Sequence, residues 1–261
     1  MKVAILCGGR GTRLREVSDL IPKPMVQIGD KPILWHVMKS YSAFGFNDFV
    51  LLLGYKGDVI REFFLNFAAH TTDVTIDLSR TDEGRLTFHG TPSEPWKVTL
   101  VDTGENTMTG ARLRRARHFL EDANCFFATY GDGVGDIDLS ALLAFHRGHG
   151  KLATVTGVLP PGRFGELSVT NNQVQKFSEK PQVSGGRING GFFVFQREVL
   201  ESFLDDREDL VLEREPMERL AAAGQLMMYR HDGFWQPMDT PREFQALNDR
   251  WAAGNAPWMV W

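Results

Sequence analysis

The sequence contains little cysteine and no long apolar run. Only Cys7 and Cys125 occur among its 261 residues, too few for a zinc site or a disulfide framework. No apolar stretch approaches the roughly 20 residues that a membrane-spanning helix needs. The short apolar stretch at the start ends at Gly8, too early for a signal peptide. These shortages predict a cytoplasmic protein that does not associate with a membrane.

An excess of positive charge is also missing. The chain has 29 Lys and Arg residues against 33 Asp and Glu residues, a formal net charge of −4. Proteins that bind phosphate backbones are usually basic, so nucleic acid is not an expected partner. The densest basic run, Arg112–Arg117, is typical of the solvated face of a helix. Hydrophobic residues make up 43% of the chain, which is enough for a substantial core and excludes a disordered protein.

Apolar runs and helical patterns alternate along the chain. Short apolar runs bounded by turn residues predict buried strands at 3–6, 49–53, 125–130, 154–159 and 192–195. Apolar residues at helical spacing predict helices at 33–41, 60–67, 113–120, 139–149, 198–204, 212–223 and 241–253. Asp30, Asp58 and Asp138 are the expected caps of the first, second and fourth helices, and Gly45 is expected to close the first. The alternation predicts an α/β fold, a mostly parallel sheet with helices on both faces.

Residues 73–99 have a different pattern. Val74–Leu78 and Arg85–His89 alternate apolar and polar residues on either side of a turn at 82–84, which predicts a β-hairpin insertion. No repeat and no long linker is visible. We therefore expect a single domain, 1–261, with an insertion at about 73–99 and a C-terminal part at about 154–261 that ends in a helical segment. In such sheets, ligands bind at the carboxyl ends of the strands.

A glycine-rich loop, Gly8-Gly9-Arg10-Gly11-Thr12-Arg13-Leu14, follows the first strand. Clustered glycines let backbone N–H groups approach an anion, and guanidinium groups bind phosphate oxygens. The loop is not a dinucleotide fingerprint, which needs glycine at Leu14, nor a Walker A loop, which needs Gly-Lys-Ser/Thr. Glycine loops alone are weakly specific, and a plain turn would leave the two arginines unexplained. The pattern favours a site for a polyphosphate.

Lys23 lies between two prolines, ten residues beyond Arg13. The flanking prolines favour extended backbone and therefore hold the lysine on a stiff segment. In isolation such a lysine is typical of a rigid exposed turn, but its position after the glycine loop favours contact with a phosphate.

Two aspartates are placed to bind a metal. Asp132 follows the strand 125–130 between two glycines, and Asp239 ends an apolar run just before the helix that begins at Pro241. Two carboxylates together with phosphate oxygens and waters are a usual environment for Mg²⁺. Asp136 and Asp138 form a second candidate, the Asp-x-Asp pattern of metal-dependent glycosyltransferases. We prefer helix capping for Asp138, because the helix 139–149 needs a cap.

Two further segments suit a sugar phosphate. Lys180 precedes a proline and follows Glu179, so a stiffened lysine could bind a monophosphate while the carboxylate accepts hydrogen bonds from sugar hydroxyls. Asn189, Gly190 and Gly191 precede a strand and would allow close approach of a sugar. No Gly-x-Ser-x-Gly or Ser-His-Asp pattern occurs, so a hydrolytic nucleophile is not expected.

The ordered set of these motifs resembles the sugar-1-phosphate nucleotidylyltransferases, and within them the glucose-1-phosphate cytidylyltransferases. The resemblance extends from Met1 to about Trp258, and its most specific parts are Glu94–Gly104, Pro160–Gly165 and Trp235–Thr240. It implies a Rossmann-like fold, Mg²⁺ as cofactor, a nucleoside triphosphate and a sugar 1-phosphate as substrates, and a homo-oligomer formed through the inserted and C-terminal segments.

The resemblance also implies roles for individual residues. The nucleotide-binding set is Leu6, Gly8, Gly9, Gly11, Thr12, Arg13, Lys23, Thr109, Gly110, Arg112 and Asp132. Arg13, Lys23 and Asp132 are its expected catalytic members. The sugar-phosphate set is Gly165, Glu179, Lys180, Asn189 and Gly190. The metal pair is Asp132 and Asp239.

The expected reaction is in-line attack of a hexose 1-phosphate on the α-phosphorus of CTP. The favoured hexose 1-phosphate is α-D-glucose 1-phosphate. The products are a CDP-sugar and pyrophosphate. Ala111 stands where the family usually has glycine, so the same chemistry with GTP or dTTP and a larger or modified sugar remains an alternative. An Asp-x-Asp glycosyltransferase and a non-catalytic sensor of sugar nucleotides are the rival classes.

Overall fold

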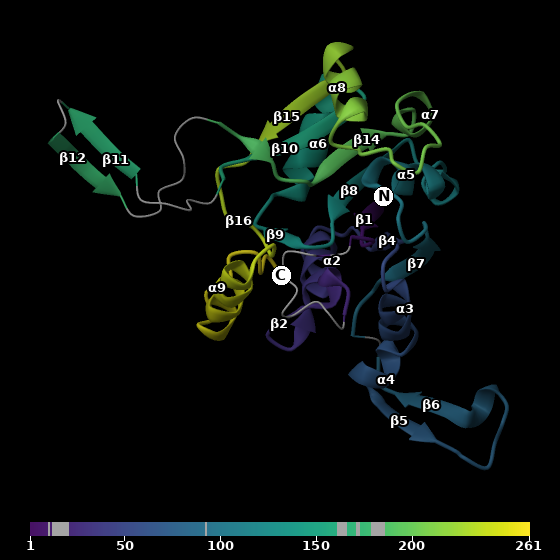
Figure 1. The fold of residues 1–261 in the computed structure, drawn as a ribbon. Helices are drawn as coiled ribbons and strands as arrows, with labels where there is room; N and C mark the ends of the chain where they lie inside the picture. The colour runs from purple at the N-terminus through teal and green to yellow at the C-terminus, as the bar shows by residue number, and fades with distance from the viewer. Residues whose placement is uncertain (10, 12–20, 92, 161–165, 171–172, 179–185) are drawn as a thin grey trace.

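The centre of the molecule is an eight-stranded sheet, drawn as arrows in Figure 1. The computed structural model describes residues 1–261 except 10, 12–20, 92, 161–165, 171–172 and 179–185. Within this part of the chain, the strand order is β13-β10-β14-β8-β1-β4-β7, with β15 pairing to β10. The strands are β1 (Lys2–Leu6), β4 (Asp48–Leu53), β7 (Lys97–Asp102), β8 (Cys125–Tyr130), β10 (Ala153–Val158), β13 (Ile188–Asn189), β14 (Phe193–Gln196) and β15 (Leu226–Arg230).

The sheet is parallel in its first half and mixed in its second. β7, β4, β1 and β8 are parallel neighbours, whereas β14 is antiparallel to both β8 and β10. β15 returns to the direction of β10. The α/β, mostly parallel sheet predicted from the alternating pattern is therefore confirmed. The carboxyl ends of β1 and β8 are neighbours, which brings the glycine loop and the Asp132 turn to one edge.

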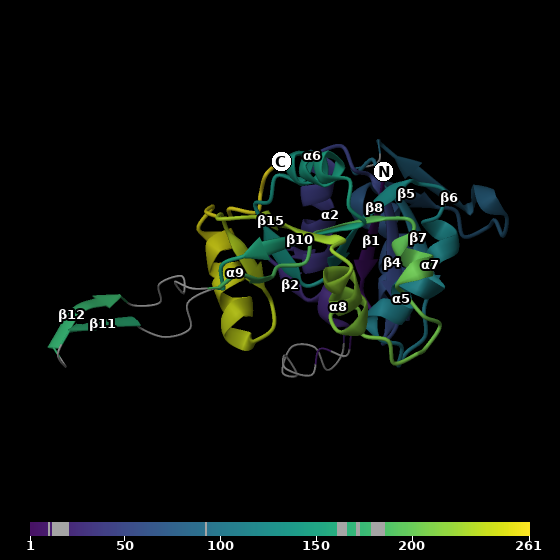
Figure 2. The same cartoon turned by 90° about the horizontal axis from the view of Figure 1, so that it is seen from above.

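Helices cover both faces of the sheet, as Figure 2 shows with α2 and α6 on one side and α5 and α8 on the other. The helices are α2 (Ile33–Ala43), α3 (Gly57–Leu65), α4 (Phe67–Thr71), α5 (Thr109–Arg115), α6 (Leu139–His149), α7 (Val199–Ser202), α8 (Glu215–Ala222) and α9 (Pro241–Ala252). Alternate residues of β1 enter different cores, Val3 and Ile5 one, Ala4 and Leu6 the other. Burial on both faces explains the continuous apolar run.

Some local predictions are confirmed and others are wrong. Asp138 caps α6, accepting the Ala141 N–H at 2.8 Å. Asp30 does not cap α2, whose N-terminal neighbour Pro32 pairs in a short hairpin of β2 (Gln27–Ile28) and β3 (Lys31–Pro32). Asp58 lies inside the first turn of α3, because Lys56 in the left-handed conformation, φ +50°, starts that helix.

The third helix begins earlier than its apolar pattern predicts. α5 starts at Thr109 and ends at Arg115, and a separate 3₁₀ turn, η4 (Arg117–Phe119), covers much of the rest of the expected helix 113–120. Ala111 and Leu113 supply the buried face of α5. The apolar residues after Arg115 belong to the turn rather than to a continuous helix.

The insertion contains a hairpin, β5 (Asp73–Ile76) paired antiparallel with β6 (Leu86–His89), which projects from the molecule beside α4 in Figure 1. A 3₁₀ turn, η3 (Glu83–Arg85), precedes β6. The expected range of about 73–99 extends too far, because Lys97–Asp102 is β7, the edge strand of the main sheet. The apolar pattern does not predict β7, because Val101 is the one buried residue on it.

Two further strand pairs belong to the described fold. β11 (Glu166–Thr170) and β12 (Gln173–Ser178) form an antiparallel pair. β9 (Gly133–Gly135) pairs antiparallel with β16 (Trp235–Pro237), which joins the segment after β8 to the segment before α9. Among the described residues, no helix is long and apolar enough to cross a membrane.

Candidate functional site

A cavity of about 440 Å³ opens at the carboxyl ends of β1 and β8. Its lining comes from the glycine loop, the 3₁₀ turn η2 (Lys23–Met25), the loop before α5, and the two aspartate turns. The lining residues are Leu6, Gly8, Gly9, Gly11, Lys23, Pro24, Glu105, Asn106, Thr107, Met108, Thr109, Arg112, Tyr130, Asp132 and Asp239. The predicted nucleotide residues Leu6, Gly8, Gly9 and Gly11 thus line one cavity. Gly11 has φ +60°, which glycine adopts without strain.

A second cavity of about 270 Å³ adjoins the first. Tyr130, Asp132 and Asp239 line both cavities. The remaining residues that line the second cavity are Thr129, Gly133, Asn189, Gly190, Phe192, Trp235 and Pro237. Asn189 and Gly190, predicted on the sugar side, therefore lie together beside the aspartate pair. Trp235 Nε1 donates to the Gly190 carbonyl at 2.8 Å, which holds this wall in place.

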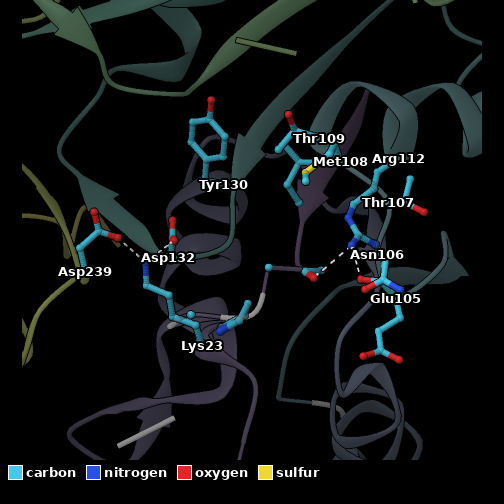
Figure 3. A pocket seen from close by; sticks show the side chains of 15 residues that line it. Lys23, Glu105, Asn106, Thr107, Met108, Thr109, Arg112, Tyr130, Asp132 and Asp239 are labelled. Carbon is cyan, nitrogen blue, oxygen red and sulfur yellow. Dashed lines mark hydrogen bonds and ion pairs between the residues drawn. The ribbon is translucent and has the colours of Figure 1, made fainter. Parts of the chain in front are cut away.

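Lys23 points between the two aspartates, as Figure 3 shows. Its Nζ donates to Asp132 Oδ2 at 2.5 Å and also to Asp239 Oδ1. The side chains are 10% exposed for Lys23, 31% for Asp132 and 19% for Asp239. Water screens the charges only partly at this burial, so the ion pairs are stronger than surface pairs.

The fold brings the two aspartates together through the β9–β16 pairing. Gly133, next to Asp132, faces Pro237, and the Met238 N–H donates to the Asp132 carbonyl at 2.8 Å. Glu243 completes a capping box with Thr240 at the start of α9, and its Oε2 also accepts the Asp239 N–H at 2.8 Å. The backbone at Asp239 is therefore fixed by the helix cap.

The aspartate pair fits a divalent metal. Burial alone would lower the pKa of Lys23, but the charges and hydrogen bonds of Asp132 and Asp239 outweigh burial and raise that pKa. The ammonium group is thus a cation held by two carboxylates at one point. Mg²⁺ is commonly bound by one or two carboxylates plus substrate phosphates and waters, so the donor set present suits this ion.

Arg112 holds the wall of the larger cavity together. Its Nη1 donates to the Leu53 carbonyl at 2.9 Å, to Thr103 Oγ1 at 2.7 Å and to the Gly104 carbonyl at 2.8 Å. Its Nη2 donates to the carbonyls of Gly8 at 3.1 Å and Glu105 at 3.2 Å. A guanidinium shared among these carbonyls fixes the glycine loop against the loop that precedes α5.

The start of α5 divides into a cavity side and a core side. Thr109 lines the larger cavity, whereas the N–H of Gly110 donates to the Leu210 carbonyl at 2.9 Å. Ala111 is 1% exposed and packs in the core with Ala4 and Leu6. Its methyl group therefore packs in the protein interior, and Ala111 does not line the larger cavity.

Several predicted residues lie outside the part that the structure describes. They are Thr12, Arg13, Gly165, Glu179 and Lys180. Conversely, Tyr130, Trp235 and the loop Glu105–Met108 line the cavities without having been assigned a role from the sequence. Tyr130 stands directly before the Gly-Asp-Gly motif, a signal that could have found it. The loop residues carry no motif.

The alternative metal motif has other partners. Asp138 is occupied as the cap of α6, as preferred from the sequence. Asp136 faces His231, whose Nε2 lies 3.0 Å from Asp136 Oδ1. Neither residue lines the two cavities. This arrangement disfavours an Asp-x-Asp glycosyltransferase.

The nucleotidyl transferase family model matches residues 2–248. The chain belongs to this family. It is 50% identical over 261 residues to the glucose-1-phosphate cytidylyltransferases of Salmonella typhimurium and Salmonella typhi, covering all of each chain. The crystal structure of HddC from Yersinia pseudotuberculosis has the same fold, with TM-score 0.69, 23% identity, and coverage of 96% of this chain and 99% of that one.

The Arg112 contacts predict that Gly54 cannot carry a side chain. A Cβ on Gly54 would overlap the guanidinium of Arg112, so Gly54→Ala should lower the free energy of unfolding by about 1–3 kcal/mol. Gly148 in α6 is the matched control, because a Cβ there would meet no described atom within 4 Å beyond its chain neighbours and the backbone of its own helix. Gly148→Ala should leave stability unchanged or raise it by up to about 1 kcal/mol. Urea unfolding measures both, and equal stability of the two variants would contradict the role given to Arg112.

Proposed function

We propose that the protein transfers the cytidylyl group of CTP to α-D-glucose 1-phosphate and releases pyrophosphate and CDP-glucose. The observation that carries the proposal is the pair Asp132 and Asp239, bridged by Lys23 where two cavities meet. The names of the Salmonella relatives support CTP and glucose 1-phosphate. On this proposal, the chain 1–261 works as one catalytic unit.

The two cavities suit the two substrates. The larger one contains the glycine loop and the start of α5, and we assign the nucleoside triphosphate to it. The smaller one contains Asn189 and Gly190, and we assign the hexose to it. The shared aspartates then lie where the α-phosphate and the sugar phosphate meet. Glu179, Lys180 and Gly165 keep the sugar-side roles that the family resemblance implies.

The reaction joins a phosphate oxygen of the sugar 1-phosphate to the α-phosphorus while the bond from that phosphorus to the pyrophosphate oxygen breaks. No covalent enzyme intermediate is needed, so the protein contributes positioning and charge. Mg²⁺, held by Asp132 and Asp239, would supply positive charge to the triphosphate oxygens when bound. Lys23 would then release the aspartates and donate to the α-phosphate, where negative charge accumulates. Arg13 would assist from the glycine loop.

Measuring pyrophosphate release from different pairs of nucleoside triphosphate and sugar 1-phosphate tests both the reaction and the choice of nucleobase. With CTP, dTTP, UTP and GTP each paired with several sugar 1-phosphates, we expect the highest rate with CTP and glucose 1-phosphate. Asp132→Asn and Asp239→Asn should each abolish that rate, because both remove a carboxylate charge. Asp138→Asn is the control, since asparagine still caps a helix, and it should keep the wild-type rate.

The outcomes separate the alternatives. A higher rate with GTP or dTTP and a modified sugar would overturn the choice of base and sugar but not the chemistry. Loss of activity in Asp138→Asn with full activity in Asp239→Asn would move the metal to the Asp-x-Asp motif. No release from any pair would support a non-catalytic sensor.

Lys23 should compete with the metal when no nucleotide is bound. Lys23→Met removes the ammonium group that contacts both carboxylates, so we expect Mn²⁺ to bind the nucleotide-free variant at least tenfold more tightly than the wild type. Calorimetry or the Mn²⁺ resonance signal measures this affinity. The same variant should lose turnover far more than CTP affinity. Weaker or unchanged Mn²⁺ binding would contradict the proposal that the Lys23 ammonium group and the metal occupy the same place between the two carboxylates.

We further propose a homo-oligomer formed through the β5–β6 hairpin. Ile76, Leu86 and Phe88 share one face of the hairpin and are 52%, 47% and 44% exposed. A two-stranded hairpin is marginally stable alone, and an exposed apolar face favours a protein contact. A second copy of the chain is the occupant that the family resemblance implies.

A charge on that face should dissociate the oligomer. Phe88→Asp is expected to reduce the molar mass measured by light scattering to that of a smaller assembly. Thr87→Asp is the matched control, because Thr87 points to the opposite face of the same strand, and it should keep the wild-type mass. A monomeric wild type, or equal masses for the two variants, would overturn the proposal.

A further inference from the structure

Tyr130 is one of the three residues that line both cavities. It ends β8, lines both cavities, and stands between the aspartates and Thr109 in Figure 3. Its ring packs edge-to-face on Phe193, with centroids 5.9 Å apart. What fixes its hydroxyl group therefore affects both substrate sites.

The carboxylate of Glu213 accepts a hydrogen bond from that hydroxyl group. Tyr130 Oη donates to Glu213 Oε1 at 2.5 Å, and Thr109 Oγ1 donates to Glu213 Oε2 at 2.6 Å. The Leu212 N–H in turn donates to Thr109 Oγ1 at 2.9 Å. Glu213 is half-buried and lines neither cavity. It therefore contacts one residue of each substrate site without reaching either substrate.

The carboxylate of Glu213 determines the direction of the two hydroxyl hydrogen bonds, those of Tyr130 and Thr109. An ionised carboxylate only accepts, so both hydroxyl protons must point at Glu213. Tyr130 then offers only lone pairs on its other side, and Asn189 Nδ2 donates to it at 3.2 Å. Asn189 Oδ1 accepts the Gly191 N–H at 2.9 Å. The amide of Asn189 is thus held in one orientation, with one N–H left for the sugar cavity.

Glu213 accepts its hydrogen bonds from neutral hydroxyl groups. In the part of the chain that the structure describes, no ion pair joins Glu213 to a lysine or arginine. A neutral glutamine would fill the same volume. It could not accept two hydroxyl protons through both of its terminal atoms.

We propose that Glu213 is a positioning residue for both substrates, acting through Thr109 on the nucleotide cavity and through Tyr130 and Asn189 on the sugar cavity. This inference rests on the assignment of those cavities in the proposed function. The sugar side depends on it more, because two successive hydrogen bonds orient Asn189. The nucleotide side depends on a single hydroxyl, that of Thr109.

Glu213→Gln tests the proposal with little change of shape. One of the two hydroxyl groups must reverse to accept from the new amide, so we expect the KM for glucose 1-phosphate to rise about tenfold. The KM for CTP should rise less, and kcat should fall less than threefold. Tyr130→Phe should raise the same KM, and the double variant should be no worse than the poorer single variant, because both changes break one chain of bonds.

Glu218→Gln is the control, since it removes the same charge from an exposed position on α8 and should leave all constants at wild-type values. Unchanged KM values in Glu213→Gln, or multiplied effects in the double variant, would overturn the positioning role. A loss of thermal stability with no change in the KM values would also overturn it.

The proposed function is tested separately by wild-type turnover in the same assay. Calorimetric titration with glucose 1-phosphate repeats the comparison between variants without requiring turnover.

Discussion

The site depends on the attraction between one ammonium group and two carboxylates. Asp132 and Asp239 would repel each other if they were brought together alone in a partly buried place. Lys23 removes that cost, and the two prolines beside it keep it on a stiff turn. The pairing of β9 with β16 and the helix cap at Thr240 then hold the aspartates at the edge where β1 and β8 end. The carboxylates suit a metal ion and the ammonium group suits a triphosphate. The arrangement that stabilises the free protein is therefore also the one that receives substrate.

Two other polar groups hold the walls around this centre. Arg112 binds loop carbonyls, and the absence of a Cβ at Gly8 and Gly54 leaves room for its guanidinium group. The absence of a side chain at Gly8 in the glycine-rich loop thus allows close packing of Arg112 as well as the approach of a phosphate. Glu213 serves a similar purpose on the other side, where it orients hydroxyl groups rather than carbonyls. Both residues act by fixing other groups, and a description of the site by substrate contacts alone would omit them.

The elements that the sequence predicts best are those with a local cause. β1 and β8 are continuous apolar runs, and α6 has its own cap in Asp138, so their bounds follow from neighbouring residues. Lys23, Asp132 and Asp239 could be singled out because each stands in a short motif beside a predicted element. β7 and the β9–β16 pair could not, since short or half-exposed strands have no distinctive period. Glu213 has no motif either, and its importance arises only from contacts with residues far away in the chain.

The position of the metal tests the central claim most directly. Crystals grown with Mn²⁺ and CTP would give an anomalous scattering peak that identifies the ion without reference to any assumed mechanism. We expect the strongest peak between the carboxylates of Asp132 and Asp239, with Lys23 displaced from both and directed at the α-phosphate. A peak at Asp136 and Asp138, or Lys23 still bridging the two aspartates in the presence of Mn²⁺ and CTP, would contradict this arrangement of the site.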